Sequence, residues 1–368
     1  MPTTTSPLRL TLAVLAVACL ACKPASQPDT KPPNEVASID DDTLPERPPI
    51  ERSGELMASG QHAEALAVLD DALKATPDDP ELHFARGIAL EQLGKPQEAV
   101  AAWQAAVQRK PDFFPALNGI GAVQLDAGQV PEAIASFKAA IAAKPDFADA
   151  HYNLGRALLA AGEVPAARTA LEAANRLAPE DVDVLLVLSE LHRKAGRVDD
   201  ALLTSRAAAR LAPDDAEVRR LLGHVLMEKD LHAEAQAEFA AALAKKPDDV
   251  DARLGLARAL VKQDKSEEAL VPLADLAVRV PDQAVVWSEW GAALAKLGRV
   301  TGPEGALARL DKALQLKPDL ASAHIRKVGA LAGSKQCKPA RDALKAFAAR
   351  KPKPDALAQA QTALAGCK

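Results

Sequence analysis

The sequence lacks the features that mark two large classes of protein. No run of alternating apolar and polar residues is long enough for a half-buried β-strand, and basic residues are not in excess. The 368 residues contain 45 lysines and arginines against 50 aspartates and glutamates, which gives a net charge of −5. A protein that binds nucleic acid needs a basic patch or stripe. We therefore expect an all-α protein without a nucleic-acid partner.

The sequence does contain a proline that returns at a fixed interval. Its steps are 34 residues long, apart from one step of 37. These prolines are Pro77, Pro111, Pro145, Pro179, Pro213, Pro247, Pro281, Pro318 and Pro352. Twelve residues before them stand Ala65, Ala99, Ala133, Ala167, Ala201, Ala235, Ala269, Ala306 and Ala340. A period between 20 and 50 residues is the signature of a solenoid built from repeated units.

Each period is expected to hold two helices. Between successive prolines lie two apolar stretches with helical spacing, and in most repeats a glycine separates them where the first helix must stop. A second proline often opens the second helix, as at Pro96 and Pro131, because its missing N–H costs nothing there. The acidic residue that directly follows the recurring proline is expected to cap the next first helix.

At these glycine, alanine, aromatic and proline positions the chain resembles the tetratricopeptide repeat family, over about residues 46–354. The resemblance implies a right-handed α-α superhelical solenoid of about nine helix-turn-helix repeats, followed by a capping helix over residues 355–368. Aromatic residues make up only 3% of the chain, and leucine often replaces them. Val328 and Lys335 stand where glycines would be expected in the last repeat, as suits a degenerate end repeat.

In this family the first helices of the repeats line a concave groove. The spacing of the family places fifteen side chains of this chain there, seven before residue 160 and eight after it. They are Phe84, Ile88, Asn118, Leu125, Tyr152, Arg156, Leu159, Leu186, Arg193, Lys194, Arg220, His224, Leu254, Arg258 and Lys262. An apolar groove with a basic middle, opposed by Glu190 and Glu228, suits an extended peptide or a partner helix with some acidic groups. The alternative is that these charges are merely solvated.

The motifs of catalysis and metal binding are missing. The sequence has no phosphate-binding loop, nucleophile elbow or zinc-ligand spacing. The tetrapeptide HAEA occurs at residues 62–65 and 232–235, five periods apart, and neither copy is a zinc-binding HExxH. His83, His151 and His324 share one repeat position and indicate packing. We therefore expect no catalytic residue, no metal and no cofactor.

Two local features interrupt the regular pattern late in the chain. Pro272 lies inside the second helix of the seventh repeat, which predicts a kink or an early break near residues 268–272. Three extra residues within 299–305 should lengthen the inter-helix turn of the next repeat. Trp287 and Trp290 lie three apart on one helix, where packing is the simpler interpretation and a ligand platform the alternative.

The N-terminus has the pattern of an export signal. Twelve uncharged, mostly apolar residues follow Arg9, which is too short a run to span a bilayer comfortably but fits a secretory signal over residues 1–21. The end of this run resembles the lipobox of bacterial lipoproteins, in which Cys22 would carry the lipid. Lipidation of Cys19 and ordinary cleavage are the alternatives. The Cys19–Cys22 pair has no strand–helix context for redox chemistry.

Residues 22–45 are predicted to be a disordered tether, because they are rich in proline and poor in apolar residues. With a lipid on Cys22, the protein would be exported and anchored to the outer membrane, facing the periplasm. The residue after Cys22 is lysine, not aspartate, which by resemblance favours the outer membrane. A soluble periplasmic or secreted protein is the alternative.

Cys337 and Cys367 are the only cysteines of the repeat body and its cap. Cys337 stands just before Pro339 opens the last second helix, and a capping helix that runs back antiparallel would end near Cys367. Disulfides persist in exported proteins. We predict a disulfide between these two residues, with free thiols or an intermolecular bond through Cys367 as alternatives.

These features predict a non-catalytic protein–protein interaction scaffold anchored in the bacterial cell envelope. Its groove would bind an extended peptide or helix of a protein partner, in the assembly of an envelope, secretion or pilus complex. The alternative is a regulatory cofactor subunit that binds and modulates a cell-wall hydrolase or a glycan-processing enzyme.

Overall fold

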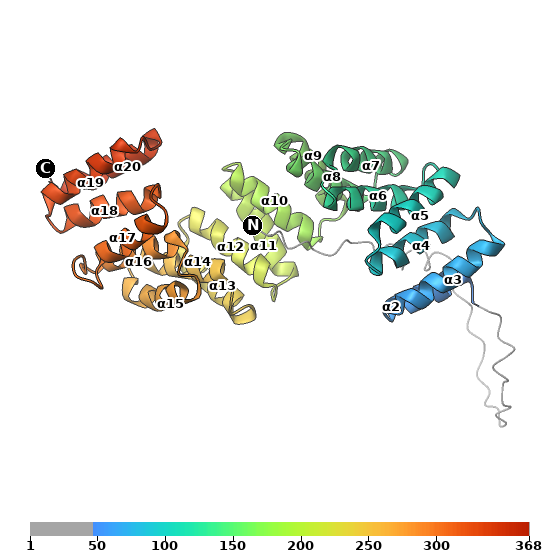
Figure 1. Ribbon diagram of the computed structural model, residues 1–368, viewed down its shortest axis with the longest axis horizontal. Coiled ribbons are helices and arrows are strands. Elements are labelled where there is room, and N and C mark those ends of the chain that lie inside the picture. The colour runs from blue at the N-terminus through green and yellow to red at the C-terminus, as the bar shows by residue number, and fades with distance from the viewer. Residues whose placement is uncertain (1–46, 368) are drawn as a thin grey trace, which may run out of the picture. The chain divides into compact units, whose positions relative to one another are not determined.

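The computed structural model describes residues 47–367, and these residues form nineteen α-helices and a short 3-10 helix. The helices follow one another as antiparallel pairs, as Figure 1 shows, so the predicted all-α repeat solenoid is confirmed. The predicted signal over residues 1–21, the tether over 22–45 and the lipid site at Cys22 lie outside the described residues. None of the described helices is both long enough and apolar enough to cross a bilayer.

The chain divides into two compact units between Pro179 and Glu180. The first unit holds four helix pairs. They are α2 (Pro49–Ala58), α3 (His62–Ala75), α4 (Pro80–Gln92), α5 (Pro96–Arg109), α6 (Phe114–Asp126), α7 (Val130–Ala143), α8 (Ala148–Ala160) and α9 (Val164–Leu177).

The second unit holds five helix pairs and a terminal helix. They are α10 (Val182–Lys194), α11 (Val198–Leu211), α12 (Ala216–Glu228), α13 (His232–Lys245), α14 (Val250–Lys262), α15 (Ser266–Arg279), α16 (Ala284–Lys296), α17 (Ala306–Leu316), α18 (Ala321–Gly333), α19 (Cys337–Ala349), α20 (Pro354–Ala363) and η2 (Leu364–Cys367). Even-numbered helices from α2 to α18 are the first helices of their pairs, and odd-numbered helices from α3 to α19 are the second.

The turn within each pair needs one residue in the left-handed region of backbone space. Glycine fills this position in six pairs, for example Gly94 with φ 71° and Gly298 with φ 71°. Three pairs use Asp230, Asp264 or Lys335 instead, with φ between 57° and 62°. A side chain there is strained, so the glycines of the repeat pattern are explained by backbone conformation.

Aspartate caps several first helices, but one residue later than the sequence pattern suggested. Asp79, Asp181, Asp215 and Asp249 each accept hydrogen bonds from two backbone N–H groups of the first turn. Each stands two residues after its recurring proline. The expectation that the directly following acidic residue caps the helix is therefore wrong, because that residue still belongs to the turn.

The shared histidine position closes the turn before the first helix in three repeats. One ring nitrogen, Nε2, lies 2.8 Å from the Pro77 carbonyl oxygen in His83 and 2.8 Å from the Pro145 oxygen in His151. A carbonyl oxygen can only accept, so Nε2 carries the proton. The Trp287 indole N–H donates to the Pro281 oxygen in the same way, at 2.8 Å. These histidines therefore have the structural role that their repeat position predicted.

Large side chains pack into spaces that glycines leave on the first helices. Phe239 on α13 is fully buried between α12 and α14. A Cβ atom at Gly223 would lie 2.8 Å from its ring, and one at Gly255 would lie 2.5 Å from it. Trp103 packs in the same manner against Gly87 in the first unit. These glycines permit the close packing of helix against side chain that the core requires.

The two interruptions of the pattern have different outcomes. Of the predicted kink or early break at Pro272, the break is wrong, because α15 runs without interruption through Pro272, and the kink stays a prediction. Ala269, Leu273 and Leu276 are fully buried around it, and their packing offsets one missing backbone hydrogen bond. The longer turn in the next pair is confirmed, since α16 ends at Lys296 and α17 begins only at Ala306.

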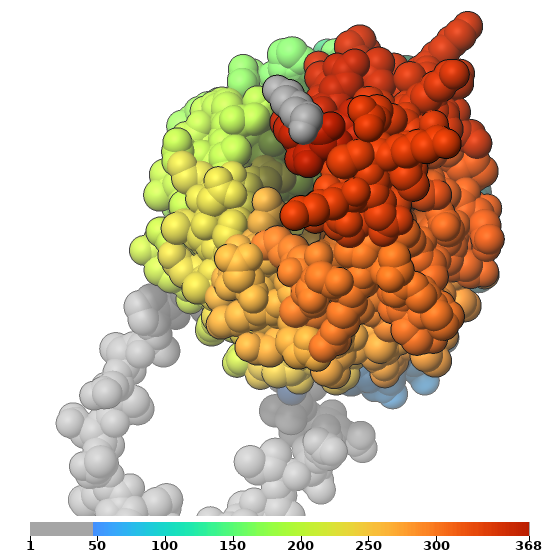
Figure 2. Space-filling model, turned by 90° about the vertical axis from the view of Figure 1, so that its left-hand side faces the viewer, coloured from blue at the N-terminus to red at the C-terminus, as the bar shows by residue number. Residues whose placement is uncertain are grey.

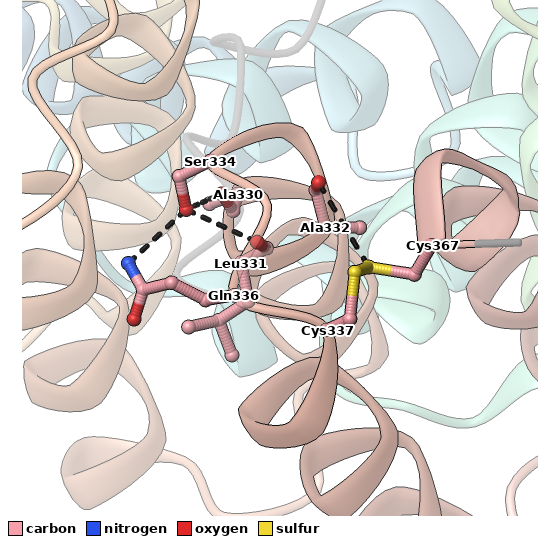
Figure 3. Close-up of a disulfide and its surroundings, with 7 residues drawn as sticks. All are labelled: Ala330, Leu331, Ala332, Ser334, Gln336, Cys337 and Cys367. Carbon is pink, nitrogen blue, oxygen red and sulfur yellow. Dashed lines mark hydrogen bonds between the residues drawn. A yellow bond between two sulfur atoms is a disulfide. The ribbon is translucent and has the colours of Figure 1, made fainter.

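The predicted disulfide between Cys337 and Cys367 is present, and its Cα atoms are 5.2 Å apart. Figure 3 shows how it joins the start of α19 to the end of the chain, beside the carbonyl group of Ala332. Helix α20 packs mainly on α18 and less on α19. The bond therefore fastens the C-terminal segment across the last helix pair.

Candidate binding surface

The expected groove residues of the first unit are mostly part of the core. Phe84, Ile88 and Asn118 are buried, and the Phe84 ring meets the Phe113 ring edge-on with centroids 5.3 Å apart. The Phe84 carbonyl oxygen accepts a hydrogen bond from Trp103 Nε1 at 3.1 Å. These three side chains hold helices together and present little surface to a partner.

The remaining groove residues of the first unit form a half-buried strip on α6 and α8. Asn153 donates from its amide nitrogen to the Asn118 side-chain oxygen at 3.1 Å, which joins these two first helices. The Arg156 guanidinium lies over the Tyr152 ring at 5.8 Å. Leu125 and Leu159 are half-buried beside them. This strip carries one cation and little else that is charged.

Glu91 on α4 is a half-buried acid that the sequence did not single out. Burial, and to a lesser extent the nearby Asp126 carboxylate, raises its pKa from 4.5 to about 7. Its Oε2 atom is buried without a hydrogen-bond partner. The folded protein therefore holds a proton on Glu91 at a pH where the unfolded chain has lost it.

Glu91→Gln should stabilise the first unit above neutral pH. A raised folded pKa stabilises the fold at low pH, and this contribution is lost as pH rises from about 4.5 to about 7. We expect the free energy of unfolding of the variant to exceed that of the wild type by about 1–2 kcal/mol at pH 8 and to match it at pH 4. One pKa unit corresponds to about 1.4 kcal/mol, and the partial exposure of Glu91 reduces the effect. Urea unfolding at both values measures this. Glu132→Gln on the exposed face of α7 is the matched control, and equal behaviour of the two variants would contradict the assignment.

The second unit carries most of the charged groove residues, and they are paired across repeats. Arg193 on α10 donates to Glu190 on its own helix at 2.8 Å and to Glu228 on α12 at 2.6 Å. Hydrogen bonding to Glu190 is the main cause that raises the pKa of Arg193 further above its usual value. Lys194 also reaches Glu190, at 3.3 Å, but stays largely exposed.

A second link between repeats, again made by hydrogen bonds of charged side chains, joins α12 to α14. Arg220 donates to Asp251 at 2.8 Å, and His224 Nε2 lies 3.0 Å from the same carboxylate oxygen. The hydrogen bond from His224, against the opposing effect of burial and with help from Arg220, lowers the pKa of Asp251 to about 2. Asp251 is therefore ionised at neutral pH between two nitrogen donors.

The third link spans three first helices. The Glu289 carboxylate on α16 accepts from Arg258 on α14 at 2.7 Å and from Arg326 on α18 at 2.7 Å. Its side chain is only 8% exposed, and Arg326 also donates to Ser288 Oγ at 2.8 Å. One buried carboxylate thus serves two arginines, which leaves this link with an excess of positive charge.

These three links form a continuous series on the first helices of the second unit, which we call the charge track. Its members are Glu190, Arg193, Arg220, His224, Glu228, Asp251, Arg258, Glu289 and Arg326. The middle of the groove is therefore less basic than the sequence suggested, because carboxylates of neighbouring repeats pair with Arg193, Arg220 and Arg258. The alternative of solvated charges still applies to Lys194 and Lys262, which are exposed. Leu254 is buried beside the track and Leu186 is half-buried, while Lys262 is exposed.

The track ends at a pocket of about 520 Å³ between the C-terminal halves of α16 and α18. Most of its lining residues are small. They are Ala292, Ala295, Lys296, Gly298, Val300, Arg326, Gly329, Ala330, Gly333 and Ser334. Figure 2 shows this end of the second unit, where residues coloured yellow to red lie around a hollow.

Trp287 and Trp290 contact each other and an arginine of the same chain. Their rings stack with centroids 5.7 Å apart, and the Arg309 guanidinium lies 4.3 Å from the Trp290 ring centroid. This cation–π contact joins the tryptophan pair to α17. The packing interpretation of Trp287 and Trp290 is therefore favoured. Among residues 47–367, no group of three or more histidine, cysteine, aspartate or glutamate side chains is placed to hold a metal ion.

Comparison with known families and structures identifies what the chain is similar to. The family model described as the Cilia and flagella-associated protein 70 C-terminal domain matches residues 79–279, which is more than half of the chain. A model of the TPR repeat matches residues 55–94. No curated protein sequence matches the chain.

Three solved structures have a similar fold. A tetratricopeptide repeat protein from Parabacteroides merdae shares 16% identity and a TM-score of 0.55, over 68% of this chain and 98% of that one. The protein of a study described as functional characterization of Pseudomonas aeruginosa pilF shares 18% identity and a TM-score of 0.52, over 56% and 93%. A chain of the APC/C hetero-tetramer Cut9–Hcn1 shares 19% identity and a TM-score of 0.52, over 77% and 55%. At these identities the similarity establishes the fold alone.

Proposed function

Since the chain belongs to the tetratricopeptide repeat family described as the Cilia and flagella-associated protein 70 C-terminal domain, we propose that it is a non-catalytic scaffold that binds an extended segment of a protein partner. The binding surface is the charge track of the second unit with its flanking lysines. Proteins built from such repeats bind protein partners, and the repeats leave the partner's identity to the surface residues.

The observation that carries this proposal is the regular linkage of the track. Each first helix from α10 to α18 is joined to the next by at least one charged hydrogen bond of 2.6–3.0 Å. Such bonds fix the side chains before a partner arrives, so little conformational entropy is lost when it binds. Alternating acids and bases also select a partner by charge complementarity and disfavour others.

The fixed track suits an extended backbone better than a compact domain. Its charged groups are spaced one repeat apart, and a peptide in extended conformation exposes polar groups at regular intervals along its length. The exposed Lys194 and Lys262 lie at the C-terminal ends of α10 and α14 and add positive charge along one edge. A partner segment with acidic residues therefore complements this surface.

Charge reversal at these two lysines tests the proposal. Lys194→Glu with Lys262→Glu should abolish partner capture by the purified chain from an extract of the cells that produce it, while the fold is kept because both side chains are exposed. Arg210→Glu with Lys246→Glu, exposed and outside the first helices, changes the net charge equally and should leave capture intact. Equal capture by both double variants would contradict a role for the track. A captured hydrolase would favour a regulatory subunit, and a captured assembly factor would favour a scaffold of an envelope complex.

We propose further that the scaffold is anchored in the bacterial cell envelope through a lipid on Cys22. The apolar run that ends at this residue and the proline-rich segment that follows support this proposal. The name of the matched family refers to cilia and flagella, but one repeat fold serves many functions, so the name does not decide the location. Mass analysis of the mature N-terminus tests the anchor. An acylated N-terminal Cys22 is expected, and an unmodified N-terminus would contradict it.

A further inference from the structure

The pocket at the end of the charge track is not explained by the packing of the helices. Its walls come from α16, from the lengthened turn after it, and from α18. A volume of about 520 Å³ falls within the range of roughly 300–1,000 Å³ that is usual for binding sites in proteins. Both helices belong to the second unit, so the pocket is a feature of that unit alone.

The pocket exists because small residues replace large ones at groove-facing positions. Arg258 on α14 corresponds to Ala292 one repeat later and to Gly329 two repeats later. In the same register, Lys262 corresponds to Lys296 and then to Gly333. The long side chain is thus lost at one of these two positions on α16, where Lys296 remains, and at both positions on α18.

Neither glycine of α18 is required by backbone conformation or by close packing. Both residues lie within the helix, and neither has a positive φ. A Cβ atom at Gly333 would meet no atom within 4 Å, and one at Gly329 would meet only Ala363 Cβ, at an ordinary 3.7 Å. By contrast, a Cβ atom at Gly291 would lie 2.6 Å from Leu310 Cγ. Gly333 is the last residue of α18, but Gly329 lies inside it, where glycine is about 1 kcal/mol less stable than alanine, so the open space at Gly329 is kept against helix stability.

The surroundings of the pocket carry excess positive charge. Glu289 is shared by Arg258 and Arg326, and α18 contains no acidic residue. Lys296 pairs with Asp264 at 2.7 Å, while Lys262 on the same edge is exposed. An apolar pocket beside uncompensated cations is complementary to an apolar side chain that has carboxylates near it in sequence.

We propose that this pocket holds one large apolar side chain, aromatic or of leucine size, from an extended protein segment whose neighbouring residues are acidic. This inference rests on the proposed function, because the segment reaches the pocket along the charge track. The anchor fills the space left by Ala292, Gly329 and Gly333, and the acidic neighbours approach Arg258, Arg326 and Lys262. A buried anchor surrounded by polar contacts is the usual way in which a few residues supply most of the affinity.

A display library of random 12-residue peptides, selected on the purified mature chain, tests the pocket. The selected peptides should share a large apolar residue with aspartate or glutamate close to it. Fluorescence anisotropy then measures their affinity for variants of the same chain. Gly333→Leu fills the pocket from a position with free space around the new side chain, and should weaken binding at least tenfold. Ala244→Leu adds the same side chain on the exposed face of α13 and should change affinity less than twofold.

The outcomes separate the pocket from the track. Thermal unfolding checks the fold, and Gly333→Leu should melt at or above the wild-type temperature, because leucine has the higher helix propensity. If the double variant Lys194→Glu with Lys262→Glu weakens peptide binding but Gly333→Leu does not, the proposal for the pocket is wrong and the proposal for the charge track stands. If neither set of changes alters the affinity of the peptides, both proposals are wrong. Selected peptides without a shared apolar residue would also overturn the pocket.

Discussion

Phe239→Ala is expected to lower the free energy of unfolding of the second unit by about 3–5 kcal/mol. The Phe239 ring is fully buried, with Gly223 and Gly255 so close that neither could carry a Cβ atom without a clash. The His224 ring meets it edge-on with centroids 5.1 Å apart. Alanine would leave a cavity that the facing helices cannot fill, because glycine offers no side chain to move into it.

Urea unfolding followed by circular dichroism measures this loss. Leu203→Ala on α11 is the matched control, since Leu203 is 69% exposed and its truncation should change stability by less than about 0.5 kcal/mol. Repeat proteins are stabilised by contacts between neighbours, so hydrogen exchange should quicken most in α12, α13 and α14. A loss below about 1 kcal/mol for Phe239→Ala would show that the interlocking of ring and glycines is not what holds these repeats together.

Removal of the disulfide should loosen the end of the second unit. Cys337 and Cys367 are separated by 30 residues, and closing a loop of this length stabilises a fold by about 3–4 kcal/mol on the chain-entropy model. Helix α20 has no further repeat after it in residues 47–367 and packs mainly on α18, so it is held from one side. Without the bond, α20 and η2 should open before the rest of the unit unfolds.

Limited proteolysis of the oxidised wild type and of Cys337→Ser with Cys367→Ser tests this effect. The double variant should be cut first between residues 350 and 363, while the oxidised wild type resists at the same protease concentration. Treating the wild type with a reductant should reproduce the variant, and the double variant itself should be unaffected by reductant. Equal resistance of the oxidised and double-variant chains would mean that packing alone holds α20.

The repeat architecture could be predicted from the sequence because its signals are local. The turn within each pair needs a left-handed residue, and glycine marks it in six pairs. The facing glycine and aromatic positions are fixed by the same period, since each pair repeats the same close packing. The disulfide followed from the order of the last helices and from having only two cysteines in that region.

The pairing of charges could not be read from individual repeats. Arg220 meets Asp251 and Arg258 meets Glu289, and each pair is 31 residues apart. Arg193 meets Glu228 at a separation of 35. Such contacts join neighbouring repeats, so they depend on how the first helices stack. A search for opposite charges at separations of 31 and 35 would have found them, and would have shown that the groove is not a basic strip.

The pocket was missed for a related reason. Glycine and alanine at groove positions look unremarkable in an alanine-rich chain, and only the structure shows that a Cβ atom would meet nothing at Gly333 and no closer atom than Ala363 Cβ at Gly329. Pro272 illustrates the opposite error. Its local effect suggested a break in the helix, but the buried residues around it keep α15 continuous.

The central claim is that the first helices of the second unit bind the partner. Site-specific photocrosslinking in intact cells tests it most directly, with a crosslinkable residue at Ala292 in the pocket, at Lys262 beside the charge track, or at Val278. Val278 on α15 is 82% exposed and lies on a second helix. The account predicts a crosslinked partner from positions 262 and 292 and none from position 278, with mass spectrometry locating the first two crosslinks in one acidic segment of the same protein. A partner captured from position 278 but from neither groove position would contradict the account.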